Sequence, residues 1–214
     1  MKPIVIYGCG YSLNELSNEQ WDELRQYDSI GFNWFIHQKW IAPTYMLVGD
    51  IRPDKNIEIL GKDDDDKYAQ YNIAVKDKRY DNTRFYMVGG YGDPNKINRN
   101  MSVINISENH WNKSATIQAL YICRMLGYKT IIYAGVDLYD YRFFFLEKDQ
   151  VRIMLSRKEH KGKYVVRKLK SPHPVYKKIL SWFNECCPED MGVYSYNPKS
   201  LLLKSKVVKL WSQQ

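Results

Sequence analysis

The residues best suited to hold a nucleotide phosphate come near the start of the chain, directly after the apolar run 3–7. Gly8-Cys9-Gly10 predicts a tight turn, because glycine adopts backbone conformations that larger residues cannot. Ser12 and Glu15 then form the S-x-x-E pattern of a capping box, which predicts a helix whose first N–H groups are unpaired and attract anions. A turn of this composition also occurs where no ligand binds, so a purely structural turn remains the alternative.

Polar residues also end the next two predicted strands. Asn33 follows the strand predicted over 29–32, and Asp50 follows the one predicted over 45–48. Ligands of open parallel sheets bind beyond the carboxyl ends of the strands, so both side chains are placed to hydrogen-bond a ribose, a base or a sugar hydroxyl. Asn and Asp are also ordinary turn residues, and this alternative stays open.

A further anion site is predicted where the most periodic helix of the chain begins. Apolar residues recur at helical spacing after Ser114, and Gly127 ends the helix. Ser114, Ala115 and Thr116 open this helix with two hydroxyl groups and with free N–H groups, which suit a nucleotide phosphate. A simple N-cap explains Ser114 equally well.

Two acids and two phenols follow the buried strand predicted over 130–134. Tyr139 and Tyr141 carry hydroxyl groups that can hydrogen-bond a phosphate and stabilise it as a leaving group without a metal. Asp137 and Asp140 could instead hold Mg²⁺. Asp137 could also anchor the loop by accepting hydrogen bonds from backbone amides, and the sequence does not decide between these roles.

One histidine is distinguished by its neighbours. His173 lies between Pro172 and Pro174, which restrict its backbone at the start of a helix predicted over 174–186. The helix N-terminus disfavours the imidazolium, so the ring stays neutral and able to accept a proton near neutral pH. His173 is therefore the candidate general base, although a lone histidine is more often structural or simply exposed.

Strands that alternate with helices must position these residues. This order predicts an α/β fold, with a Rossmann-like, mainly parallel sheet flanked by helices. The length of 214 residues favours one nucleotide-binding domain over 1–214. Residues 141–172 are basic, aromatic and poorly periodic, which predicts a lid over the site. Further strands are predicted at 72–75, 83–88 and 193–196, and the last of these closes the sheet.

The charge balance predicts anionic ligands. The formal net charge is +8 and the isoelectric point lies near 9.1, which favours nucleotide phosphates or an anionic membrane surface as partners. No nucleic-acid-binding motif accompanies this charge, so we expect no nucleic-acid partner. No apolar run approaches the ~20 residues that cross a bilayer, and no signal peptide is expected. Four cysteines without zinc or disulfide spacing suit a reducing cytoplasm, with peripheral contact at the inner face of the membrane as an option.

Five segments follow one another in an order that is more specific than any single motif. They are 6–13 (Ile-Tyr-Gly-Cys-Gly-Tyr-Ser-Leu), 31–33 (Gly-Phe-Asn), 126–129 (Leu-Gly-Tyr-Lys), 133–139 (Tyr-Ala-Gly-Val-Asp-Leu-Tyr) and 197–202 (Asn-Pro-Lys-Ser-Leu-Leu), with His173 before the last. This order resembles the bacterial sialyltransferases of glycosyltransferase family 42. In that resemblance, His173 stands at the place of the family's catalytic base.

The resemblance implies an inverting glycosyltransferase, which moves sialic acid or a related nonulosonic sugar from a CMP-sugar to a hydroxyl of a glycan or glycolipid. It implies that Asn33 contacts the cytidine nucleotide, that Tyr139 binds the departing phosphate with Tyr141 as a second phenol, and that His173 deprotonates the acceptor. No metal and no cofactor are expected, and a homo-oligomer remains open. The expected nucleotide-binding residues are Gly8, Cys9, Gly10, Ser12, Asn33, Asp50, Ser114, Ala115, Thr116 and Asp137.

Two other functions remain alternatives. The glycine–serine turn and the late L-G-Y…G-x-D pattern also resemble archaeal 6-hydroxymethylpterin diphosphokinase-like proteins, which transfer diphosphate from ATP. In that resemblance Asp50, Asp137 and Asp140 become candidate Mg²⁺ ligands. The third alternative is a nucleotide-binding module without catalytic activity.

Overall fold

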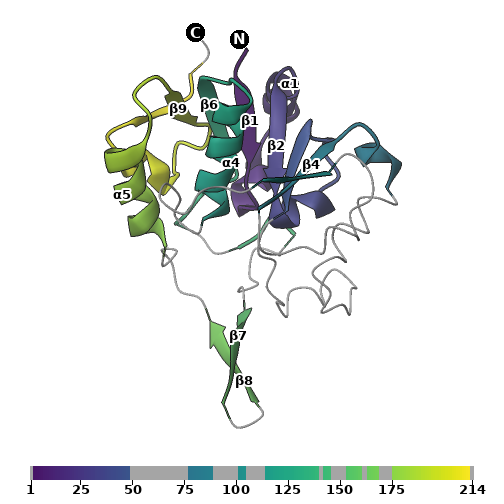
Figure 1. Cartoon of the computed structure of the whole chain (residues 1–214), viewed down its shortest axis with the longest axis vertical. Coiled ribbons are helices and arrows are strands. Elements are labelled where there is room, and N and C mark those ends of the chain that lie inside the picture. The colour runs from purple at the N-terminus through teal and green to yellow at the C-terminus, as the bar shows by residue number, and fades with distance from the viewer. Residues whose placement is uncertain are drawn as a thin grey trace.

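Eight parallel strands form one sheet in the computed structural model, which describes residues 2–48, 77–88, 101–104, 114–139, 142–145, 153–160, 163–168 and 175–212. The strand order is β10-β9-β6-β1-β2-β3-β4-β5, and each neighbouring pair is parallel. Figure 1 labels β9, β6, β1, β2 and β4 in this order. The predicted α/β, Rossmann-like architecture is confirmed. The strands are β1 (Ile4–Tyr7), β2 (Asp28–Phe32), β3 (Tyr45–Val48), β4 (Arg84–Val88), β5 (Met101–Ile104), β6 (Thr130–Ala134), β9 (Gly192–Ser195) and β10 (Val208–Leu210).

The centre of the sheet is the strand with the most continuous apolar sequence. All four residues of β1, Ile-Val-Ile-Tyr, are fully buried. A parallel strand that is covered on both faces needs such a run, because neither face meets water. The described α-helices that cover the sheet are α1 (Asn18–Leu24), α4 (Ala115–Met125) and α5 (Tyr176–Cys186). None of the described helices is long and apolar enough to cross a membrane.

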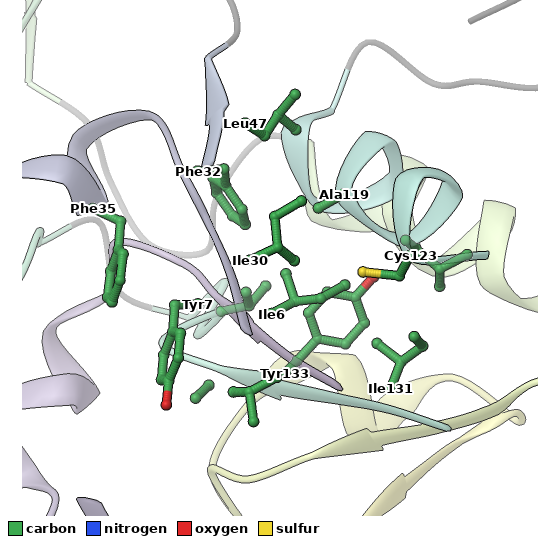
Figure 2. Packing of buried hydrophobic residues seen from close by; sticks show 14 of the residues in the cluster. Ile6, Tyr7, Ile30, Phe32, Phe35, Leu47, Ala119, Cys123, Ile131 and Tyr133 are labelled. Carbon is green, nitrogen blue, oxygen red and sulfur yellow. The ribbon is translucent and has the colours of Figure 1, made fainter. Parts of the chain in front are cut away.

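Tyr7 shows how α1 covers one face of the sheet. Its ring stacks on Trp21 of α1, with ring centroids 5.8 Å apart. On its other side it stacks almost parallel to Phe35, at 4.9 Å (Figure 2). Gly31 of β2 leaves the space that Phe35 occupies, since a Cβ at residue 31 would come within 2.3 Å of the Phe35 ring.

Tyr133 shows how α4 and α5 cover the opposite face. Ile6 is paired with Tyr133 in the parallel ladder, so Tyr133 lies on the face opposite to Tyr7. The Tyr133 hydroxyl donates to the Thr116 carbonyl of α4 at 2.9 Å, and its ring meets Phe183 of α5 edge-on at 5.9 Å. These aromatic contacts join the sheet to helices on both of its faces.

The capping box predicted for Ser12 and Glu15, directly after the glycine turn (Gly8-Cys9-Gly10), is wrong. A short 3-10 helix, η1 (Tyr11–Glu15), follows the turn and has no side-chain cap. The hydroxyl of Ser12 bonds the distant Asp137 instead. The capping box of this region opens α1, where Gln20 N–H donates to Ser17 Oγ at 3.3 Å and Ser17 N–H donates to Gln20 Oε1 at 2.9 Å.

The structure also differs from the predicted elements in several short strands. Strand 193–196 does not close the sheet, because β10 pairs with β9 on its outer side. β5 and β10 were not predicted, and the helical segment that follows β2 is a 3-10 helix, η2 (Asn33–His37). The strand predicted over 72–75 lies outside the described residues.

The predicted lid contains two strands that its irregular sequence did not indicate. β7 (Ile153–His160) pairs with β8 (Lys163–Lys168) in an antiparallel ribbon, with an irregular register between Leu155 and Glu159. Figure 1 shows this ribbon beyond the carboxyl edge of the parallel sheet, apart from it. Its function as a lid stays a prediction.

We expect Tyr7→Phe to stabilise the protein. The Tyr7 hydroxyl is fully buried and has no hydrogen-bond partner among the described residues, so removing it removes a desolvation cost. The free energy of unfolding, measured by urea denaturation, should rise by about 1 kcal/mol. Tyr133→Phe is the matched control, because it deletes an equally buried hydroxyl that does have an acceptor, and it should lower stability by about 1 kcal/mol. Changes of the same sign in both variants would contradict this account.

Candidate functional site

The strand order creates a switch point between β1 and β6. From β1 the chain proceeds through β2, β3, β4 and β5 to one side, and from β6 it proceeds to β9 and β10 on the other side. Loops that leave such a pair in opposite directions open a crevice at the carboxyl ends of the strands, where parallel sheets bind ligands. The predicted glycine turn follows β1. The predicted tyrosine segment, which contains Tyr139 and Tyr141, follows β6, so both segments begin at the switch point.

The glycines of the turn are required by the close approach of the β6 loop. Gly8 N–H donates to the Ala134 carbonyl and Gly10 N–H donates to the Gly135 carbonyl, both at 2.8 Å. A Cβ on residue 8 would come within 2.2 Å of the Gly135 oxygen, and one on residue 10 within 2.3 Å of Asp137 Oδ2. The N–H groups of both glycines are therefore engaged with β6, which supports the structural alternative for these two residues.

Asp137 is the centre of a buried hydrogen-bond network at the switch point. Its side chain is 3% exposed. Oδ2 accepts from the Ser12 backbone N–H at 3.0 Å, and Oδ1 accepts from the Ser12 hydroxyl at 2.5 Å and from Asn197 Nδ2 at 2.8 Å. Both oxygens of the carboxylate are thus engaged by protein donors. These contacts favour the anchoring role that the sequence left open for Asp137, and they place Ser12 in the same network.

A late segment of the chain completes this network. Asn197 Nδ2 also donates to the Tyr139 hydroxyl at 3.3 Å, and the Ser200 hydroxyl donates to the Val136 carbonyl at 2.6 Å. Leu201 N–H donates to the Asp137 carbonyl at 3.0 Å. Asn197 was not predicted as a site residue, nor was Ser200 predicted to anchor the loop that carries it. Their signal in the sequence was a pair of polar residues just after the last predicted strand, at the edge where ligands bind.

The end of β2 is tied to the glycine turn. The Cys9 thiol donates to the Phe32 carbonyl at 3.2 Å, and Cys9 is almost completely buried. Asn33 follows with a φ of 53°, a left-handed conformation that asparagine tolerates better than most residues, and its side chain is partly exposed. Asn33 therefore lies at the carboxyl edge of the sheet, as predicted. Cys9 is buried and connects the glycine turn to the end of β2.

The N-terminus of α4 differs from a simple capped helix. Ser114 is the N-cap residue, yet its side chain makes no capping hydrogen bond. Ser114 and Ala115 are partly exposed, whereas Thr116 is buried and its carbonyl accepts from Tyr133. The N-cap alternative is therefore not realised by the Ser114 hydroxyl, and Thr116 belongs to the core side of the helix.

The chain that leaves β6 returns across the glycine turn. Phe143 forms an isolated antiparallel β-bridge with Gly10, and Phe144 N–H donates to the Cys9 carbonyl at 2.9 Å. The Arg142 guanidinium lies over the Tyr11 ring, with its central carbon 4.0 Å from the ring centroid. Residues 142–145 thus place a cation and several aromatic rings beside the turn. They belong to the segment 141–172 predicted as a lid, but none of them was named as a site residue.

Four of the predicted site residues lie outside the described residues. These are Asp50, Tyr141, His173 and the alternative Mg²⁺ ligand Asp140. The structure brings Gly8, Cys9, Gly10 and Ser12 together with the loop of Asp137, and Asn197 connects Tyr139 to Asp137. The predictions for the general base and for the second phenol stay predictions.

A hollow of about 420 Å³ lies at the opposite, amino edge of the sheet. Lys2, Arg25, Asp28 and Thr44 are among the residues that line it. None of the predicted site residues contributes to its wall. It is therefore separate from the network around Asp137.

Comparison with protein-family models, with curated proteins and with solved structures found no significant match. The likeness to a sialyltransferase family consequently rests on the order of the sequence segments alone.

Proposed function

We propose that this protein is an inverting glycosyltransferase that uses a CMP-activated sialic acid or a related nonulosonic sugar. One observation carries the proposal: four of the family-like segments, far apart in the sequence, meet at the switch point. Ser12 of the first contacts Asp137 of the fourth, Cys9 contacts Phe32 beside Asn33, and Asn197 of the last contacts Asp137 and Tyr139. A resemblance confined to local sequence would not require these segments to contact one another through hydrogen bonds.

In the proposed reaction, an acceptor hydroxyl attacks the anomeric carbon of the donor sugar. A bond forms between the acceptor oxygen and this carbon while the bond from the carbon to the phosphate oxygen breaks, and the configuration inverts. His173 takes the hydroxyl proton, and CMP departs with the bonding electron pair. Tyr139, with Tyr141 as a second phenol and the N-terminus of α4 near Ser114, stabilises the charge that grows on the phosphate.

The contacts of Asp137 support sugar transfer over diphosphate transfer from ATP. In diphosphate transfer Asp137 would be a Mg²⁺ ligand. Its two oxygens instead accept hydrogen bonds from Ser12 and Asn197, so a metal would have to compete with these donors. In sugar transfer no carboxylate is needed at the phosphate, and Asp137 keeps the two loops in place.

We expect CMP to raise the thermal midpoint of unfolding more than ATP does. A ligand that binds only the folded state stabilises it by mass action, so CMP at a hundredfold its Kd should raise the midpoint by roughly 5–10 °C. Thermal denaturation with CMP, CMP-sialic acid, CMP-Kdo or ATP, each with and without Mg²⁺, measures this. Equal or larger stabilisation by ATP that depends on Mg²⁺ would favour the diphosphokinase alternative. CMP binding without turnover of any CMP-sugar would favour the catalytically inactive module.

A further inference from the structure

The orientation of the Asn197 side chain is fixed by its own loop. Asn197 Oδ1 accepts the Lys199 backbone N–H at 2.9 Å, so the oxygen of the amide faces the following residues. The nitrogen must then face the opposite way, toward Asp137 and Tyr139. The hydrogen-bond partners thus determine which end of the amide is the donor.

The backbone around Asn197 is held on both sides. Tyr196 N–H donates to the Tyr133 carbonyl at 2.8 Å, and Ser200 N–H donates to the Asn197 carbonyl at 3.1 Å. The Tyr196 hydroxyl donates to Glu23 of α1 at 2.7 Å. Burial, together with this carboxylate, raises the pKa of Tyr196, so its hydroxyl remains a donor to Glu23 at neutral pH. Asn197 therefore has little freedom to move relative to the sheet.

The two N–H groups of this fixed amide are shared between an anchor and a phenol. One donates to the buried Asp137 carboxylate at 2.8 Å, and the other reaches the Tyr139 oxygen at 3.3 Å. Because the Tyr139 oxygen accepts from Asn197, its own O–H bond must point away from Asn197. The donated bond also polarises the hydroxyl and makes it a better donor, since linked hydrogen bonds strengthen one another.

The turn that presents Tyr139 is strained. Leu138 has a φ of 61°, which is unfavourable for a residue with a branched side chain. Such strain persists only where neighbouring contacts hold it, and it is concentrated at functional sites. Here the contacts of Asp137 and Asn197 lie on either side of the strained residue, which connects the amide of Asn197 to the placement of the phenol.

We infer that Asn197 is a positioning residue that directs the Tyr139 hydroxyl toward the departing phosphate of the donor. This inference rests on the proposed function, because the phosphate is that of the CMP-sugar. Asn197 does not touch the reacting atoms in this account. Its effect on the reaction passes through Tyr139.

A double-mutant cycle tests this dependence on Tyr139. Asn197→Ala should lower kcat for CMP release by about tenfold, the upper range for one hydrogen bond, and should change CMP affinity little. In a Tyr139→Phe background the same substitution should lower kcat by less than about twofold, because the hydroxyl that it positions is gone. An equal loss in both backgrounds would overturn the inference.

Ser200→Ala is the matched control for general damage to the loop. Ser200 holds the same loop through the Val136 carbonyl and does not contact Tyr139 in the hydrogen bonds described above. It should lower the thermal midpoint and leave kcat within about twofold of the wild-type value. A loss of kcat as large as that of Asn197→Ala would show that loop stability alone explains the effect and would overturn the inference.

A spectroscopic measurement separates this inference from the proposed function. The side-chain amide signals of Asn197 in a ¹H–¹⁵N NMR spectrum should shift in Tyr139→Phe and stay in place in Ser200→Ala. This readout needs no substrate and does not require Asn197→Ala to fold. An amide shift without any turnover of CMP-sugars would refute the proposed reaction and keep the pairing of Asn197 with Tyr139. Unchanged amide signals in Tyr139→Phe would overturn the pairing even in an active enzyme.

Discussion

Asp137→Asn is expected to lower the free energy of unfolding by on the order of 3 kcal/mol, the cost of losing charge-assisted hydrogen bonds and leaving buried donors unpaired. The carboxylate accepts from Ser12 N–H, from the Ser12 hydroxyl and from Asn197. An amide of the same shape has only one oxygen, so its NH₂ group must face at least one of these donors. The side chain is almost completely buried, and water cannot replace the lost acceptor.

Urea denaturation measures this loss, and Asp22→Asn is the control. Asp22 makes an exposed ion pair with Arg25, so the same chemical change there should cost less than about 0.5 kcal/mol. If Asp137→Asn unfolded at the wild-type urea concentration but no longer bound CMP, Asp137 would be a ligand contact and its anchoring role would be wrong.

His173→Ala is expected to lower sugar transfer by roughly a hundredfold to ten-thousandfold, the usual range for removing a positioned general base. The two flanking prolines and the place of His173 downstream of the tyrosine segment motivate this prediction. CMP affinity should stay close to the wild-type value, because the base acts on the acceptor and not on the nucleotide.

The assay is transfer at saturating donor and acceptor across a range of pH, with folding checked separately. In the wild type, activity should fall as acid protonates the imidazole, since only the neutral ring accepts a proton. The variant should lose this acidic limb of the profile. A folded variant with wild-type turnover and an unchanged profile would eliminate His173 as the base, whereas weaker CMP binding alone would indicate a positioning role.

The strands that the sequence predicted best are those with a strong local signal. Residues 45–48 and 131–134 are continuous apolar runs, and the structure has strands over 45–48 and 130–134 as predicted. β10 has only three residues, of which two are exposed, so no hydrophobic pattern distinguishes it from a loop. It forms a strand because β9 offers an unpaired edge, which is a property of the folded sheet.

The misread capping box has a different cause. Ser12 carries the local pattern of an N-cap, but its hydroxyl bonds a residue 125 positions away. A propensity rule compares only near neighbours, whereas Asp137 is brought to Ser12 by the pairing of β6 with β1. The same pairing explains why Asn197 was missed, since its contact with Asp137 spans 60 positions. Local residue types predicted the edge of the sheet where the candidate site lies, and the strand order decided which residues meet there.

The sharing of one carboxylate by Ser12 and Asn197 has a consequence for biosynthesis. The ribosome makes Ser12 early, Asp137 after β5, and Asn197 only after β9, so the network closes only once the residues that follow β9 have emerged. A nascent chain that stops before β9 already carries the glycine turn and Tyr139, but its buried carboxylate lacks one donor and β6 lacks its outer neighbour. Native contacts between such distant residues form late, because a long loop must close first. Translation therefore has to pass β9 before Asn197 can hold Tyr139 in its place, and products truncated before β9 lack this contact.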